Sequence, residues 1–334
     1  MPVPAIPMPA PTPAPASFVA SIARLDVGVA APELTISMAS KTWLYNLQHR
    51  KRNAAKASTL ATFASHARRI VGATGNVSVA TFGNKQMKQF VADLAADSLS
   101  PKSIQEISGA LKQIIASVVD ADTGDRCYPR SWNHQFLDLP QVRNQSQPTI
   151  TSTQLEAILA DGIEPLDRCL WILLAVTGLR IGEARSLRIG YSANHSCWIP
   201  EDSVLHVRSA MWRAVEQSPK TQAAIRSVEI CKQLNDVLLG FARGRKGSFL
   251  FGGDRAVPES TLRLHFDSHF ENLGFHSLRR FRATYLAECG VPSAIDHYWI
   301  GHATQGVHDK YNKLAKNISL RREWAEKIGL GFTI

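Results

Sequence analysis

The sequence predicts a mainly α-helical protein with a small antiparallel sheet, made of an all-helical N-terminal half and an α+β C-terminal half. Between Thr35 and Val118, apolar residues recur at the spacing of one helix face. Between Val204 and Ile230, two segments alternate apolar and polar residues, as half-buried strands do. Helical periodicity returns from Ser277 onward. Helices alone in one half, and helices beside a short sheet in the other, predict two domains.

Composition limits the class of protein and of partner. The 334 residues are enough for two domains, and the net charge of +10 favours a polyanionic partner, most often nucleic acid and sometimes a membrane surface. No apolar run is long enough to span a bilayer, and no basic segment followed by an apolar one opens the chain, so we expect neither a membrane partner nor a signal peptide. Five cysteines without a C-x-x-C pair argue against a zinc site and for a reducing interior, which predicts a cytoplasmic protein.

Three segments are expected along the chain. Residues 1–34 predict an extended or disordered leader, because seven of the first 15 residues are proline. A helical domain is expected over residues 35–145. The turn residues and prolines between Asp120 and Ile150 are typical of a linker, so a second domain is expected over residues 150–334.

The helices of the first half are expected around Trp43, around Phe63 and from Met87 to Leu94. A further helix begins at Ser100-Pro101, because serine is a good N-cap and proline a good first helical residue.

The charge of this half has one sign. From Thr35 to Ala92 there is no acidic residue, while nine basic ones occur. Such helices suit contact with a phosphate backbone, although a solvated basic face without a ligand would look the same. The candidates for DNA contact are Arg50, Lys51, Arg52, Lys56, Arg68 and Arg69.

The second half mixes helices and strands. A helix is expected to open at "TSTQLEAIL", and Leu166–Thr177 predicts a buried helix. The segments "VLHVRSAMW" and "IRSVEI" predict strands, and "SFLF" predicts a short one that ends at Gly252-Gly253.

Several familiar catalytic sites are missing from the sequence. It contains no G-x-x-x-x-G-K-[ST] loop, no H-E-x-x-H, no G-x-S-x-G, and no cluster of carboxylates of the kind that holds two metals. Chemistry on a phosphate would therefore proceed without a metal or other cofactor. It would need a protein nucleophile, fixed cations for the non-bridging oxygens and a proton donor for the leaving oxygen.

Two segments offer the cations. "TGLRIGEARSL" places Arg180 after a buried helix and a Gly178 turn, and Glu183 three residues later could orient a cation. His276 and Arg279 are three residues apart and therefore share one face at a helix start. Lys220 is expected in the turn between two strands, from which a lysine can reach into a cleft and give up a proton.

These segments resemble the motifs of the tyrosine recombinases, the phage integrase family. "TGLRIGEARSL" is similar to the family's first arginine box, and "HSLRRFRATYLAECG" to its His-x-x-Arg box. "IGH", ending at His302, resembles its Leu-Gly-His, and Tyr311 follows at a spacing similar to that of the family's nucleophile. The motifs come in the family's order, and the likeness covers about Thr35 to Ala325. Arg280 and Ile300 depart from the usual histidine and leucine, but neither is a proposed catalytic position.

The resemblance implies a role for each matching residue. Arg180 and Arg279 would hold the scissile phosphate, His302 would bond a non-bridging oxygen, and His276 would also bond the phosphate and could take the nucleophile's proton. Tyr311 would attack to leave a 3′-phosphotyrosyl link, Lys220 would protonate the departing 5′ oxygen, and Glu183 would brace the site. The helical half would be the family's core-binding domain, which closes with the catalytic half around duplex DNA, and the protein would act as a tetramer on paired sites.

Two other functions stay open. One is a type IB topoisomerase-like enzyme, which shares this chemistry. The other is a catalytically silent DNA-binding protein of the same fold.

The tail also allows two arrangements. Apolar residues between Ile318 and Ile334 predict contact with an adjacent protomer, which we favour, or packing on the tail's own domain.

Overall fold

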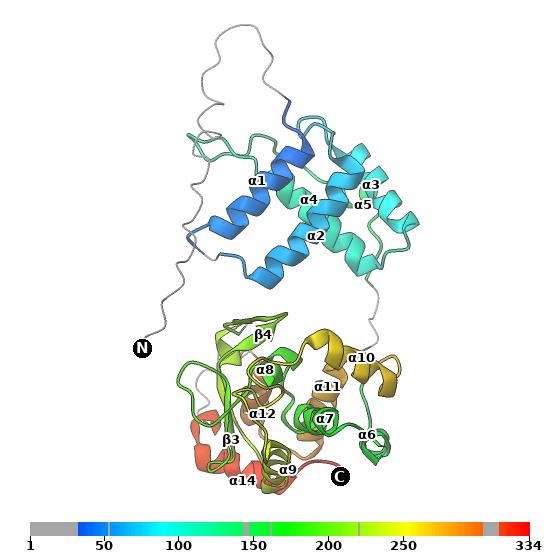
Figure 1. Cartoon of the computed structure of the whole chain (residues 1–334). Coiled ribbons are helices and arrows are strands. Elements are labelled where there is room, and N and C mark those ends of the chain that lie inside the picture. Colours follow the sequence, from blue (N-terminus) through cyan, green and yellow to red (C-terminus); the bar gives the residue numbers. More distant parts are fainter. Residues whose placement is uncertain (1–32, 53, 143–146, 161, 220, 303–313) are drawn as a thin grey trace, which may run out of the picture. The chain divides into compact units, whose positions relative to one another are not determined.

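The computed structural model describes residues 33–52, 54–142, 147–160, 162–219, 221–302 and 314–334. The chain divides into two compact units, Met1–Gln145 and Ser146–Ile334 (Figure 1). The helices within the described ranges include none that is both long enough and apolar enough to cross a membrane.

The regular elements in the described part of the first unit are all helices. Its elements are α1 (Ile36–His49), α2 (Ala57–Thr74), α3 (Asn84–Ala96), α4 (Pro101–Ala116) and the single turn α5 (His134–Leu137). Helix starts follow the capping rules: the Thr35 side chain accepts a hydrogen bond from the Met38 amide, and Ser100 caps α4 with Pro101 as the first helical residue. The periodicity in the sequence therefore predicted α1 to α4 correctly, whereas α5 lies in the stretch that was expected to be a linker.

One apolar cluster holds the first unit together. It joins Ile36 and Trp43 of α1, Ile70 of α2, Phe90 of α3 and Leu111 of α4, all less than 5% exposed. Burying a side chain of this kind contributes about 2 kcal/mol, so the apolar stripes of these helices fix their packing while their other faces stay in water.

The second unit is built around α7. The helices are α6 (Ser152–Ala160), α7 (Pro165–Thr177), α8 (Ile181–Arg185), α9 (Lys232–Ala242), α10 (Glu259–His269), α11 (His276–Glu288), α12 (Ser293–Ile300) and α14 (Ile318–Ile328), with 3₁₀ turns η2 (Gln222–Ala224) and η3 (Leu314–Lys316). Buried residues occupy α7 from Cys169 to Thr177 without interruption. Because it is apolar on every side there, α7 can be surrounded, and it packs against α8, α9, α10 and α11 (Figure 1).

Two small sheets complete this unit. Strands β1 (Arg188–Ile189), β2 (Cys197–Ile199), β3 (Val204–Val207) and β6 (Arg226–Glu229) form one sheet in the order β1-β2-β3-β6, and β4 (Ala210–Trp212) pairs with β5 (Val215–Gln217) in the other. The β1–β2 pair is parallel, and the other pairs are antiparallel. The expected fold class, mainly α with a small and largely antiparallel sheet, is confirmed.

Two strand predictions need correction. "VLHVRSAMW" forms β3 and β4 in different sheets rather than one strand, because the Ser209 hydroxyl and amide bond the buried Ser196 and divert the chain. "SFLF" is not a strand: Phe249 makes an isolated bridge with Arg188, and Leu250 donates its amide to Leu187.

Candidate functional site

The site begins at the turn between α7 and α8. Gly178 ends α7 with φ +64°, and a Cβ there would lie 2.6 Å from Cδ1 of Ile300. The left-handed backbone therefore favours glycine, and a side chain there would also displace the end of Ile300 on α12. The turn places Arg180 at the start of α8 with its side chain 34% exposed.

Glu183 is the buried anion of the site, and its side chain is 2% exposed. Its carboxylate accepts hydrogen bonds from the Arg180 amide at 3.1 Å, from Nη1 of Arg180 at 2.8 Å and from Nη2 of Arg226 at 3.0 Å. Burial alone would raise the pKa of Glu183. The charge and hydrogen bond of Arg226, followed by those of Arg180, outweigh burial and hold that pKa below its usual value.

Arg279 joins two helix ends. It lies on α11, is 5% exposed, and donates to the carbonyl of Gly178 at 2.7 Å and to that of Ile300 at 2.5 Å. Burial, and then the charge of Arg180, lower the pKa of Arg279 to about 10, so the guanidinium stays charged at neutral pH. It is thus a fixed cation between the end of α7 and the end of α12.

Two histidines carry lowered pKa values beside these arginines. His276 is the first residue of α11, and its side chain is exposed. Partial desolvation is the largest cause that lowers the pKa of His276, and the charges of Arg279 and then Arg180 lower it further. His302 follows the Gly301 turn after α12, and the same three causes, in the same order, lower its pKa. Both rings are therefore neutral at pH 7, when each can accept or donate a proton.

The structure brings five of the sequence-predicted residues into one electrostatic neighbourhood. They come from the start of α8, the first turn of α11 and the residues just after α12, and they are Arg180, Glu183, His276, Arg279 and His302. Lys220 and Tyr311 lie outside the described residues. Fixed cations beside neutral imidazoles can stabilise charge on a phosphate and move a proton.

Arg226 is a site residue that the sequence did not reveal. It lies in β6 with a fully buried side chain, bonded to Glu183 across 43 positions of sequence. A basic residue in an alternating strand predicts a solvent-facing position. Only its place in "IRSVEI", in register with the buried Val228 and Ile230, could have indicated an inward direction.

The β4–β5 hairpin, after which Lys220 follows, is fixed by polar contacts to its neighbours. Glu216 of β5 accepts from Oγ of Ser209 at 2.5 Å and from Nη2 of Arg188 at 2.8 Å. Arg185, 1% exposed, donates from Nη2 to the carbonyl of Arg213 at the hairpin turn. The first arginine box thus supports the hairpin as well as Arg180.

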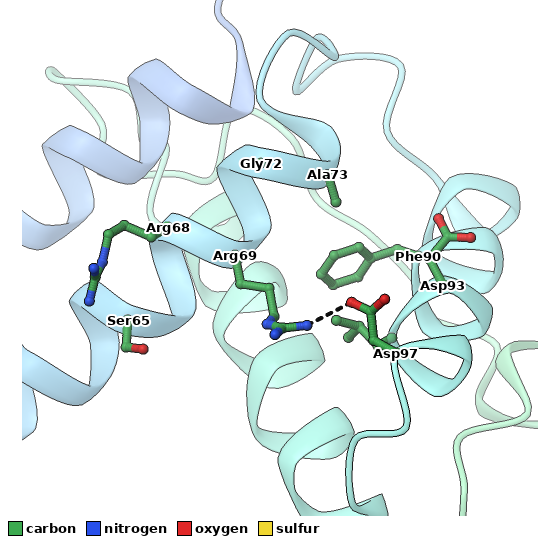
Figure 2. A pocket seen from close by; sticks show the side chains of 9 residues that line it. Ser65, Arg68, Arg69, Gly72, Ala73, Phe90, Asp93 and Asp97 are labelled. Carbon is green, nitrogen blue, oxygen red and sulfur yellow. Dashed lines mark hydrogen bonds and ion pairs between the residues drawn. The ribbon is translucent and has the colours of Figure 1, made fainter.

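The six DNA-contact candidates of the first unit lie at the end of α1, in the connection to α2 and along α2. All are exposed except Lys56, which is half-buried. Arg69 makes an ion pair with Asp97 at 2.7 Å, beside a shallow cavity of about 580 Å³ between α2 and α3. Figure 2 shows Arg69 directed at Asp97, while Arg68 extends away from that pair. The two neighbouring arginines therefore have different surroundings.

In the described structure the tail from α14 onward packs onto its own unit, which is the second of the two arrangements that the sequence allowed. Ile328 and Leu330 join the core around α7, and Oη of Tyr285 donates to the carbonyl of Ile328 at 2.8 Å. Arg321 binds both oxygens of the buried Glu229 at 2.7 Å each. Buried polar pairs of this kind specify one partner surface, whereas the apolar pattern suited either.

No protein-family model matches the sequence, and no curated protein sequence matches it. Solved structures do match. An integrase of the Tn1549 transposon in complex with a circular intermediate DNA superposes with a TM-score of 0.64 at 18% identity, covering 89% of this chain and 100% of that one. The chain has an integrase fold.

Lambda integrase structures support the same conclusion. A dimer bound to a COC′ core site matches with a TM-score of 0.60 and 14% identity over 85% of this chain and 97% of that one. A lambda integrase tetramer bound to a Holliday junction matches with a TM-score of 0.59 and 15% identity, covering 89% of this chain and 84% of that one. The tyrosine recombinase fold expected from the motifs is thereby confirmed. At these identities the matches establish fold, and function has to be argued from the site.

Proposed function

We propose that this protein is a site-specific DNA recombinase or integrase that breaks and rejoins DNA through a 3′-phosphotyrosyl intermediate. The convergence of Arg180, Arg279, His276 and His302 supports this most directly, because segments far apart in sequence place them within electrostatic range of one another. Four such side chains suit one phosphodiester, whose charge increases in the transition state. The DNA complexes among proteins of the same fold favour the same substrate.

The arginines would bind the scissile phosphate. Arg180 is one-third exposed and held by Glu183, so its guanidinium is both accessible and oriented. Arg279 uses two of its five N–H groups for the hydrogen bonds to the two carbonyls, and these bonds fix the plane of its guanidinium group. Fixed donors lose little freedom when the phosphate arrives, which makes them effective in the transition state. His302 would add a hydrogen bond to a non-bridging oxygen.

The reaction would transfer the phosphoryl group to Tyr311. The tyrosine oxygen attacks phosphorus, the bond from phosphorus to the 5′ oxygen breaks, and the pair of electrons leaves with that oxygen. His276, neutral at pH 7, takes the tyrosine proton, and Lys220 gives a proton to the 5′ oxygen. One phosphoester replaces another, so the step needs neither ATP nor a metal, and reversal with a second DNA end completes strand exchange.

The first unit would bind duplex DNA as the core-binding domain, over residues 35–145, and residues 150–334 would be the catalytic domain. Exposed basic residues at the end of α1 and along α2 would follow the phosphate backbone. We infer a homotetramer on paired sites, acting at the nucleoid on integrated or circular DNA of a mobile element.

A duplex with a nick close to the cleavage point tests the proposal. After cleavage the short fragment diffuses away, which traps the covalent protein–DNA product. Wild-type protein should form an adduct that survives denaturation, and Tyr311→Phe should form none while it still binds DNA, because only the nucleophilic oxygen is removed.

Other outcomes point to other functions. DNA binding without an adduct would indicate a silent DNA-binding protein. An adduct together with relaxation of supercoils, without strand exchange between paired sites, would indicate a type IB topoisomerase-like enzyme. An adduct that persists in Tyr311→Phe would move the nucleophile to another tyrosine.

A further inference from the structure

Arg226 is a buried arginine at the centre of the site. Its side chain has no exposed surface, and its register in β6 places it opposite Val207 of β3. A guanidinium buried this completely is stabilised only when each nitrogen has a fixed partner. Arg226 has one for each: Nε donates to the carbonyl of Trp299 at 2.6 Å, Nη1 to that of Ala224 at 2.9 Å, and Nη2 to Oε2 of Glu183 at 3.0 Å.

Each of these partners belongs to a segment that carries a proposed catalytic residue. Glu183 holds Arg180 through both its amide and its side chain. Trp299 lies three residues before His302 at the end of α12. Ala224 closes the η2 turn that follows Lys220 in the sequence. One guanidinium therefore bonds α8, the end of α12 and the η2 turn just before its own strand, and it adds to the link that Arg279 makes between the end of α7 and the end of α12.

The contact with the His302 turn is especially close. Gly301 ends α12 with φ +72°, and a Cβ there would lie 2.9 Å from Nη1 and 3.0 Å from Cζ of Arg226. The flat guanidinium therefore packs directly against the backbone of Gly301, the residue that precedes His302. A lysine could not replace it, because an ammonium is a point charge on a flexible stem and does not present donors in three fixed directions.

We propose that Arg226 is a positioning residue, which sets the placement of Arg180 and His302 relative to each other without touching DNA. This rests on the function proposed above. Fixed placement matters because displacing a catalytic group by about 1 Å can slow an enzyme about 100-fold. A structural residue would change only the amount of folded protein, whereas a positioning residue changes the rate of the folded enzyme.

Arg226→Lys tests the role in single-turnover adduct formation on the nicked duplex. Arg321→Lys is the matched control: Arg321 is also buried in a carboxylate pair of the same unit and lies over the Tyr298 ring of α12, but it bonds neither Glu183 nor a backbone carbonyl of α12. Arg226→Lys should lower the rate about 10- to 100-fold with DNA affinity nearly unchanged. Arg321→Lys should lower the melting temperature but leave the rate within about twofold.

The coupling between Arg226 and Glu183 gives a second readout. If Arg226 acts through Glu183, the Arg226→Lys/Glu183→Gln double variant should be slowed by less than the product of the two single effects. If Arg226→Lys does not fold, the double variant Arg226→Gln/Glu183→Gln is used in its place. This double variant removes both charges of the buried ion pair, so neither is left unpaired in the interior.

The outcomes separate this inference from the proposed function. A wild-type protein that forms no adduct refutes the function. A reactive wild type, with Arg226→Lys as fast as Arg321→Lys or with fully multiplicative effects in the double variant, refutes the positioning role.

Discussion

The basic residues of the candidate site and those proposed to contact DNA from the first unit are held in opposite ways. In the second unit, Arg226 and Arg279 are buried, and each donates to carbonyls or to a carboxylate at 3.0 Å or less. In the first unit, the basic residues from Arg50 to Arg52 are exposed on the short connection between two helices. A buried, bonded cation has one position and a strong field, whereas an exposed one is screened by water and salt.

This difference separates two tasks. Chemistry on one phosphate needs cations whose direction is fixed before the substrate arrives, because reorganisation would add to the barrier. Holding a duplex needs many weak contacts that tolerate small shifts, and exposed side chains supply these through release of counterions. Changes in the second unit should therefore alter rate, and changes in the first should alter affinity.

The largest effect is expected at Arg279. Arg279→Lys should slow adduct formation about 100- to 1,000-fold, because a lysine loses one of the two carbonyl contacts and the planar fork. Arg280→Lys is the matched control, because Arg280 donates, among the described residues, to the carbonyl of Pro148 at 2.8 and 2.5 Å and is not proposed to bind the phosphate. Rates are measured with the nicked duplex at saturating protein. Equal slowing in both variants would contradict the assignment of Arg279.

The next effect concerns the pH dependence of stability. The pKa of Glu183 is held below its usual value of 4.5, so its ion pairs stabilise the folded protein fully above that value. This contribution is lost as the pH falls through the lowered pKa. Urea unfolding of Glu183→Gln at pH 7 should show a loss of about 3 kcal/mol, since a buried partner is removed from Arg226. The difference in free energy of unfolding between Glu183→Gln and wild type should become smaller toward pH 3. A difference that stays constant with pH would contradict the prediction.

A smaller effect is expected from the connection between α1 and α2. Replacing Arg50, Lys51 and Arg52 together by glutamine should weaken duplex binding about tenfold at low salt and reduce the slope of log affinity against log salt by up to about 3. The rate of cleavage by the bound complex should not change. Replacement of Lys102, a basic residue at the start of α4 outside this set, serves as the control. A slower rate of cleavage with unchanged affinity for the duplex would contradict the assignment of DNA binding to the first unit and catalysis to the second.

The sequence predicted the helices well and the polar connections poorly. Helix α7 was expected from Leu166 to Thr177 and spans Pro165–Thr177, because its burial follows directly from its apolar run. Arg180 and Glu183 were recognised because they share one helix turn. Arg226 was missed because its partners are Glu183, 43 residues away, and Trp299, 73 residues away, and no local pattern reports such contacts.

The tail shows the same limit. Its apolar residues predicted burial correctly but not the surface that buries them. That choice depends on Arg321 meeting Glu229, at a separation of 92 residues, and on Tyr285 reaching the carbonyl of Ile328. Hydrophobic periodicity therefore gives the elements, and long-range polar pairs decide how they are joined.

The smallest effect should distinguish Arg68 from Arg69. Arg69 is paired with Asp97, and both side chains are exposed, at 42% and 63%, so the pair itself contributes at most about 1 kcal/mol to stability. A DNA phosphate near Arg69 would have to compete with the Asp97 carboxylate, whereas Arg68 extends away from that carboxylate (Figure 2). We therefore expect Arg68→Gln to weaken duplex binding more than Arg69→Gln, by about twofold to fivefold against almost none. Asp97→Asn, measured by the same titration at low salt, should release Arg69 and slightly raise affinity. Equal losses for the two arginine variants, with no gain in Asp97→Asn, would show that the ion pair does not restrain Arg69 and that both residues contact the backbone alike.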